Sequence, residues 1–388
     1  MNIYRFALFL SIALIASIQL GIIIPLFPII AHQQNISASL SGIVAAMTPL
    51  GGLVIALFSE KILQRWGFQR TILFGLIGNL ILFIVLWTQP LSLANWLITR
   101  FFMGMMFSLT FMPAQTAIGL EAKFNRALYV NLIGVVFVVV LTIGPFFTNL
   151  MTYGAETVVA VLIGLQLTSL LMIGFIANSQ PPALNPHQPY VSRIRLLPSI
   201  WVALLPALLF GCVELSLFSL FPQEALARGL SISQISTIIA LFSFSALVAQ
   251  LPISMLVDKF SARRVAMVLY PLVALILCVP LWSFTFWSLL GVSIGLGILI
   301  GHGYYFCVAY VNSMVQQEYL VKSNIIIEMM YNITTIVIPI MIGYYLNADD
   351  RSSIFVPLLV VSVIVGLLHY GKSFGSILGG NSNASRER

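Results

Sequence analysis

The chain of 388 residues is 60% hydrophobic and only 7% charged, whereas about a quarter of the residues of a soluble domain are charged. This composition excludes a water-soluble globular fold and predicts an integral membrane protein. The formal net charge of +7 belongs mostly to loops between apolar runs, so it does not argue for nucleic-acid binding. The three cysteines lie inside apolar runs and predict neither disulfides nor a metal site.

Apolar runs long enough to cross a bilayer recur along the whole chain. About 20 residues at 1.5 Å per residue cross a hydrocarbon core of roughly 30 Å, and the lack of period-2 alternation favours helices over strands. We therefore predict an all-α fold with twelve transmembrane helices. The expected spans are 6–30, 39–60, 71–88, 93–118, 127–149, 155–177, 199–221, 232–256, 265–283, 286–314, 322–346 and 353–371.

The distribution of basic residues predicts the orientation of these spans. The first apolar run has no cleavage site of the A-x-A kind, so we expect it to be retained as a span rather than removed as a signal peptide. Of the 18 Lys and Arg residues, all but Arg100, Arg228 and Arg351 fall in loops and tails on the side of the N-terminus. The positive-inside rule places that side in the cytoplasm. Both termini are therefore expected to be cytoplasmic, in a multi-pass protein of the inner (plasma) membrane.

An internal repeat divides the chain into two halves. At an offset of 194 residues, P-L-F-P (25–28) aligns with S-L-F-P (219–222), and Pro145 aligns with Pro339. The segment Q-R-W-G-F-Q-R (64–70) aligns with D-K-F-S-A-R-R (258–264) in the same register. A duplicated six-helix unit of this kind is typical of secondary transporters, with the substrate bound near the bilayer midplane between the halves.

A Pro-rich polar stretch between the sixth and seventh spans predicts the domain boundaries. Residues 178–198 are read as a cytoplasmic linker in extended conformation. The expected units are an N-terminal six-helix bundle (1–177), a C-terminal six-helix bundle (199–371) and a cytoplasmic tail (372–388).

The loop after the second span of each half resembles a motif of the major facilitator superfamily, G-x-x-x-D-R/K-x-G-x-R/K-R/K. The second copy has Ser254 and Ser261 at the glycine positions and otherwise matches through Asp258, Lys259, Arg263 and Arg264. The first copy has Glu60 and Gln64 at the first glycine and the acid, and retains Arg65, Gly67 and Arg70. The resemblance implies that the acid binds the positive end of a neighbouring helix and stabilises one conformation. Topology alone also demands basic residues here, so that simpler reading stays open.

Two further fragments extend this resemblance over essentially the whole chain. Arg100 and Gly104 match the family's R-x-x-x-G, and Gly144-Pro145 matches part of a motif of family members that export drugs by proton antiport. The resemblance implies two pseudo-symmetric six-helix bundles, similar to small bacterial inner-membrane exporters. Gly144, Pro145 and Pro339 are expected to break their helices.

Glu214 is the most informative residue, because it lies well inside the seventh span. Phe210, Gly211, Leu217, Phe218 and Phe221 are its neighbours at helical spacing. In an apolar environment a carboxyl group can exchange a proton near neutral pH, which favours proton coupling or substrate binding. A structural hydrogen bond to another helix and an acid satisfied at the interface are the alternatives.

Arg100 and Glu328 are the other formal charges well inside spans. Such charges normally face a bundle interior or a water-filled cavity. Arg100 shares a small and polar helix face with Gly104, Ser108 and Gln115, and it either ties helices together or couples charge. Whether it pairs with Glu214 is left open by the sequence. Glu328 heads a polar stripe at helical spacing; snorkelling and a cytoplasmic gate are its alternative roles. The stripe comprises Asn324, Glu328, Tyr331, Asn332 and Thr335.

Three uncharged positions complete the candidate cavity. His302, in G-H-G-Y-Y of the tenth span, could relay protons or make an ordinary hydrogen bond. Tyr305 lies one turn later, and Gln19 of the first span is a weaker candidate.

These features predict a secondary transporter that exports a small organic or amphipathic solute by alternating access, with protons as the coupling ion. No P-loop is present, so direct use of ATP is not expected. A proton-coupled importer or facilitator is the alternative within this class. A polytopic membrane enzyme is the alternative outside it, although the four histidines are widely spaced. We expect no cofactor, a monomer, and the small-molecule solute, protons and the lipid bilayer as partners.

Overall fold

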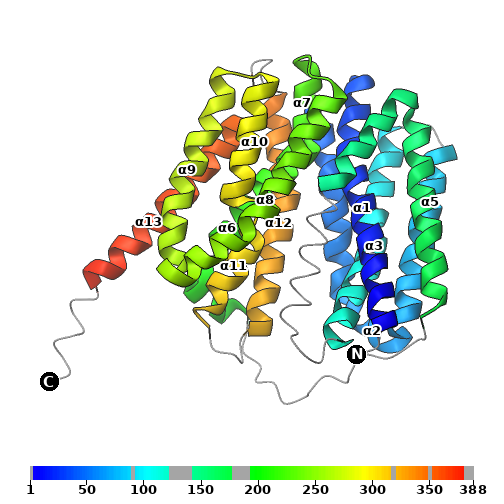
Figure 1. Cartoon of the computed structure of the whole chain (residues 1–388), viewed down its shortest axis with the longest axis horizontal. Coiled ribbons are helices and arrows are strands. Elements are labelled where there is room, and N and C mark those ends of the chain that lie inside the picture. The colour runs from blue at the N-terminus through cyan, green and yellow to red at the C-terminus, as the bar shows by residue number, and fades with distance from the viewer. Residues whose placement is uncertain are drawn as a thin grey trace.

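The computed structural model of the chain describes residues 3–88, 92–121, 142–176, 193–315, 320–347 and 352–379. Every regular element within these ranges is a helix (Figure 1). The N-terminal half, as we use the term, comprises α1 (Ile3–Gln33), α2 (Ala38–Thr88), α3 (Leu93–Glu121), η1 (Gly144–Tyr153) and α5 (Ala155–Gly174). The C-terminal half comprises α6 (Arg193–Ser219), α7 (Phe221–Ala227), α8 (Ile232–Phe260), α9 (Ala262–Trp282), α10 (Phe286–Ile300), α11 (Gly303–Asn312), α12 (Leu320–Leu346) and α13 (Phe355–Gly379).

The helices agree with the expected spans over most of the described chain. Among the described residues, ten helical stretches are long and apolar enough to cross a membrane, and Phe355–Gly371 is a shorter apolar helix at the position of the twelfth expected span. Most of the fifth expected span, 127–149, lies outside the described residues. Its described end is the 3-10 helix η1, which has Pro145 in its first turn.

The two copies of the repeated loop share an unusual backbone conformation. α2 contains two spans joined at a kink, where Gly67 has φ 79° and ψ 175°. Ser261, its counterpart at the offset of 194 residues, has φ 74° and ψ 147° between α8 and α9. A positive φ suits glycine and is costly for serine. The same positive-φ turn in both halves supports the register of the internal repeat.

Several helix boundaries differ from the expectation. α6 begins at Arg193, within the expected linker (178–198), and α13 continues to Gly379, within the expected tail (372–388). The tenth expected span is broken at Gly301-His302 into α10 and α11, and Gly303 lies so close to α6 that a Cβ there would be 2.8 Å from the Pro206 carbonyl oxygen. The chain after the seventh span turns at Leu220 and forms the short helix α7. The break expected at Pro339 is wrong, because α12 is continuous through this residue.

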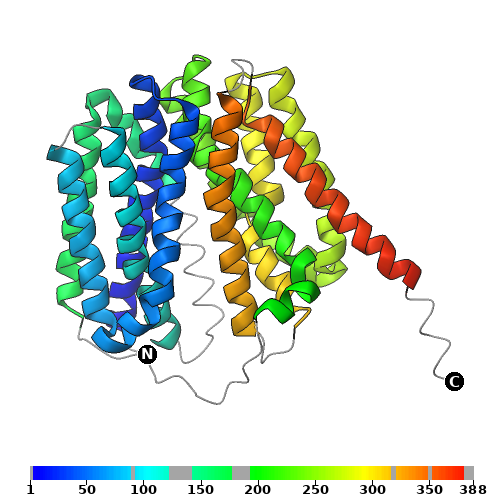
Figure 2. The ribbon, with the colours of Figure 1, turned by 180° about the vertical axis from the view of Figure 1, so that it is seen from behind.

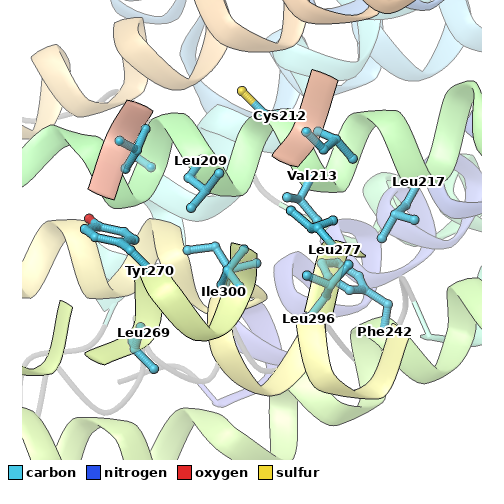
Figure 3. Close-up of a cluster of buried hydrophobic side chains, with 14 of the residues drawn as sticks. Leu209, Cys212, Val213, Leu217, Phe242, Leu269, Tyr270, Leu277, Leu296 and Ile300 are labelled. Atoms are coloured by element: carbon cyan, nitrogen blue, oxygen red, sulfur yellow. The ribbon is translucent and has the colours of Figure 1, made fainter. Parts of the chain in front are cut away.

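Buried side chains fall into separate clusters in the two halves. The largest cluster is built from residues of α6 to α13, and two smaller clusters are built from residues of the N-terminal half. α6 lies within the largest cluster, where Leu209, Val213 and Leu217 pack against α8, α9 and α10 (Figure 3). In its most apolar stretch 72% of residues are buried, the largest share among the spans that the structure describes. The polar side chains of Glu214, Ser216 and Ser219 on α6 accordingly lie in the protein interior.

The two halves meet at the end opposite the N-terminus, which we call the closed end. α2 packs against α12 there (Figure 2), and a Cβ on Gly42 would collide with the Pro339 carbonyl oxygen. Thr148 and Ser236 share a hydrogen bond of 2.8 Å between their hydroxyl groups. Two more hydrogen bonds join the halves at this end. Gln223 Nε2 donates to the Ile36 carbonyl oxygen, and Asn347 Nδ2 donates to Ser39 Oγ.

Candidate functional site

Glu214 is held in the C-terminal half by a tyrosine from another helix. The side chain projects from α6 and the residue is only 8% exposed. The Tyr331 hydroxyl of α12 donates a hydrogen bond of 2.6 Å to Glu214 Oε2. Gly211, one turn earlier on α6, allows this approach, since a Cβ there would lie 3.3 Å from the Tyr331 ring. The carboxyl group is thus buried, with a neutral hydrogen-bond donor rather than a cation as its partner.

Glu328 is hydrogen-bonded in a similar way but is exposed. The Tyr304 hydroxyl of α11 donates to Glu328 Oε2 at 2.7 Å, and Asn332 Nδ2 donates to Oε1 at 3.1 Å. Both donors are neutral, and neither carboxylate oxygen forms an ion pair within the described residues.

The position of Glu328 on α12 shows which way its exposed side chain faces. Thr335, Pro339 and Ile342 follow at helical spacing on the same face, and all three are buried. Pro339 meets α2 of the N-terminal half on this face. Because Glu328 lies on the same face but toward the other end, it is exposed where the described parts of the two halves have separated. The exposed face around Glu328 is called here the vestibule wall.

Aromatic rings join the two carboxylates into one acid–tyrosine cluster. The Tyr304 and Tyr331 rings meet edge to face with centroids 5.7 Å apart, and Tyr305 makes a similar contact with Tyr304 at 5.7 Å. Phe210 of α6 stacks on Tyr331 at 6.0 Å. The cluster is defined as Glu214, Glu328, Asn332, Phe210, Tyr304, Tyr305 and Tyr331.

The sequence predicted four members of this cluster as site residues and missed Phe210, Tyr304 and Tyr331 in that role. Tyr331 belongs to the polar stripe of α12, one turn after Glu328, so its signal was helical spacing. Tyr304 adjoins Tyr305, and the helix break before Gly303 decides which tyrosine reaches Glu328. That break is a tertiary feature, so spacing along an unbroken span could not assign the contact.

Arg100 lies in the other half and does not pair with Glu214. The residue is 1% exposed, and its Nη1 donates to the Ile23 carbonyl oxygen of α1 at 3.0 Å. Within the described chain no carboxylate lies in ion-pair range of this guanidinium. The observed contact agrees with the alternative in which Arg100 ties α3 to a neighbouring helix.

The remaining candidates are distributed over both halves. Gln19 Nε2 donates to the Leu162 carbonyl oxygen at 3.1 Å, and Gln19 lines a small pocket of the N-terminal half with Thr48 and Asn79. His302 is buried at the start of α11, next to the Phe306 ring. The side chain of Gln115 lies outside the described residues.

The loop motif residues lie at the end of the molecule opposite the closed end. Asp258, Lys259 and Arg264 are exposed, and so are Arg65 and Arg70 in the first copy. In the described structure Asp258 forms no ion pair. The His369 ring Nε2 lies 3.2 Å from the Arg263 carbonyl oxygen, which joins the second copy to α13.

The closed end contains a helix that the sequence did not predict, α7, which is bonded to both halves. Gln223 Nε2 donates to the Ile36 carbonyl oxygen of the N-terminal half at 2.6 Å. Glu224 forms an ion pair with Arg228 at 2.9 Å and accepts from the Ile354 backbone N–H at 2.9 Å. Burial raises the pKa of the Glu224 carboxyl, although Ile354, Ser353 and Arg228 each favour its charged form.

Comparisons with known proteins bear on both the fold and the family. The family model of the Major Facilitator Superfamily matches residues 9–231 and 217–373. The uncharacterized MFS-type transporter YfkF of Bacillus subtilis (strain 168) is 24% identical over 364 residues, which cover 92% of this chain and 92% of that relative. The nucleoside transporter NupG superposes with a TM-score of 0.80 at 11% identity, over 96% of this chain and 99% of NupG. A bacterial homologue of the human lysosomal transporter Spinster superposes with a TM-score of 0.67 at 15% identity, over 95% and 97% of the two chains.

Proposed function

We propose, from the premise that the chain belongs to the Major Facilitator Superfamily, that it couples the export of a small organic or amphipathic solute to proton entry. Membership makes the protein a multi-pass membrane transporter, which sets aside the membrane-enzyme alternative. Direction, coupling ion and cellular membrane are part of the proposal. The observation that carries it is the buried Glu214 carboxyl, bonded to a tyrosine and without a cationic partner in the described chain.

The Glu214 carboxyl is costly to ionise where it lies, because it is buried. An ionised carboxylate removed from water is expensive unless it is paired, and proton uptake removes that cost. A tyrosine hydroxyl supports the carboxylate by one hydrogen bond but brings no compensating charge. Glu214 is therefore suited to gain and lose a proton as the water around it changes during alternating access.

The orientation in this proposal comes from the basic residues. Arg65, Arg70, Lys259 and Arg264 lie at the end away from the closed end, and the positive-inside rule assigns that end to the cytoplasm. The vestibule wall then faces the cytoplasm and the closed end faces outward. In the proposed cycle, solute enters from the cytoplasm, the closed end opens, and a proton from outside replaces the solute.

The test compares wild type with Glu214→Gln in proteoliposomes loaded with a pH-sensitive dye. A panel of organic cations and neutral amphipathic compounds is added, and solute-driven proton flux is recorded. We expect flux with wild type and only the leak of empty liposomes with Glu214→Gln. Exchange of labelled for unlabelled solute needs no net proton movement, so the variant should retain it.

Glu156→Gln is the matched control, since Glu156 is an exposed acid at the closed end. Its proton flux should equal that of wild type. Proton flux that survives in Glu214→Gln would assign coupling to another group. Solute uptake by wild type without any proton flux would favour the facilitator, and proton flux in the same direction as the solute would favour an importer.

A further inference from the structure

We propose that the vestibule wall binds an organic monocation, with Glu328 as the counter-charge and the Tyr304 and Tyr305 rings as its aromatic walls. This substrate class rests on the proposed function in one respect only, namely that the solute enters through the vestibule. The role given to Glu328 is separate from that of Glu214, which holds the coupling proton.

The charge of Glu328 is not balanced by any cation within the described residues. Its carboxylate oxygens accept from Tyr304 and Asn332, and both donors are neutral, so the hydrogen bonds orient the carboxylate without neutralising it. An exposed carboxylate with free lone pairs can still accept from an ammonium group, because each carboxylate offers about four acceptor positions. A cationic ligand would supply the charge that this side of the cluster lacks.

The tyrosine rings beside Glu328 are arranged nearly at right angles. Tyr304 and Tyr305 are inclined to each other by 83°, and Tyr304 and Tyr331 by 79°. Rings at right angles form a corner in which a cation can meet the negative face of one ring and contact another. Cation–π attraction is strongest for groups that lose little hydration, such as quaternary ammonium ions.

The two acids of the cluster differ in exposure. Glu328 is exposed on the vestibule wall, whereas Glu214 is 8% exposed behind Tyr331. A solute of molecular size can reach Glu328 directly, while a proton needs only a hydrogen-bonded path to Glu214. Tyr331 contacts Tyr304 and bonds Glu214, so occupation of the corner is placed to affect the coupling acid.

The probe is rhodamine 6G, a fluorescent organic cation, whose binding to the purified protein is followed by fluorescence polarisation without any gradient. Benzyltrimethylammonium and neopentylbenzene compete as a matched pair, since they differ only in carbon for nitrogen and hence in charge. We expect the cation to compete at least about tenfold better than its neutral isostere. Equal competition by the two compounds would overturn the proposal.

Variants then assign the effect to particular residues. Glu328→Gln should weaken cation binding about tenfold or more and remove the preference over the isostere. Glu328→Asp, which keeps the charge, should retain the preference and covers the case in which Glu328→Gln does not fold. Tyr305→Leu should weaken the binding of benzyltrimethylammonium more than that of neopentylbenzene. Unchanged discrimination in Glu328→Gln would contradict the assignment.

Glu156→Gln is the control for binding, since Glu156 lies at the closed end, away from the corner. It should bind benzyltrimethylammonium as wild type does. Charge-selective binding without proton flux in liposomes would refute proton coupling and leave the monocation site standing. Proton flux driven by neutral solutes, with no charge selectivity in binding, would refute the monocation site and leave proton coupling standing.

Discussion

At position 100 a guanidinium lies in the interior of the N-terminal half with a backbone carbonyl oxygen as its hydrogen-bond partner. Such a residue can be structural or functional, and size-matched substitutions separate the two roles. Apolar residues of similar volume often replace buried charged groups at little cost, whereas truncation leaves a cavity.

We therefore expect the unfolding temperature of Arg100→Met to lie within a few degrees of the wild-type value, and this variant should retain transport. Arg100→Ala should lose about 2–4 kcal/mol of stability. Thermal unfolding can be followed with a thiol-reactive dye, because Cys212 and Cys307 are free and buried. If Arg100→Met keeps its unfolding temperature but loses transport, the charge of Arg100 is functional and the structural interpretation is wrong.

At the scale of elements, glycines decide how closely helices can approach. α2 and α3 cross with Gly51 and Gly104 at the contact, and a Cβ on Gly104 would collide with the Thr48 carbonyl oxygen. Close approach through small residues is a common mode of packing in membranes, where lipid removes the hydrophobic drive between helices. Gly164 of α5, by contrast, is exposed and has no atom within 4 Å of its Cβ position.

Gly104→Ala is expected to cost about 1–3 kcal/mol through overpacking and to lower the unfolding temperature. Gly164→Ala should leave that temperature unchanged or raise it, since alanine favours helix by up to about 1 kcal/mol. The same thiol-dye assay measures both variants. Equal stability of the two would show that α2 and α3 do not cross as closely as the structure has them.

For the whole molecule, transport by alternating access requires the closed end to open. Thr148 and Ser236 place hydroxyl oxygens from the two halves 2.8 Å apart, so cysteines at both positions are close enough to be joined by a disulfide. The double variant with Thr148→Cys and Ser236→Cys should lose transport activity on oxidation and recover it on reduction.

Each single cysteine variant is the control and should transport under both conditions. Gel shifts before and after reduction report the cross-link. Full transport by a fully cross-linked protein would mean that this end stays closed throughout the cycle, which alternating access between rigid halves does not allow.

The sequence by itself determined the membrane environment, the helical class and the register of the repeat, because hydrophobic length and composition act locally and survive any arrangement of the helices. Gly67 and Ser261 illustrate this, since an alignment of loops identified two turns that share a positive φ. The charges at positions 214 and 328 were also readable, because a charge within an apolar run is costly wherever the helix lies.

Only the tertiary structure decided which groups meet. The break at Gly301-His302, the helix α7 and the continuous α12 depend on packing between helices, which overrides local expectations such as a proline break at Pro339. The sequence left open whether Arg100 pairs with Glu214. The structure shows that they do not pair, because the two residues lie in different halves and have other partners. Contacts such as Tyr331 to Glu214 join positions 117 residues apart, and no period along a single helix encodes that distance.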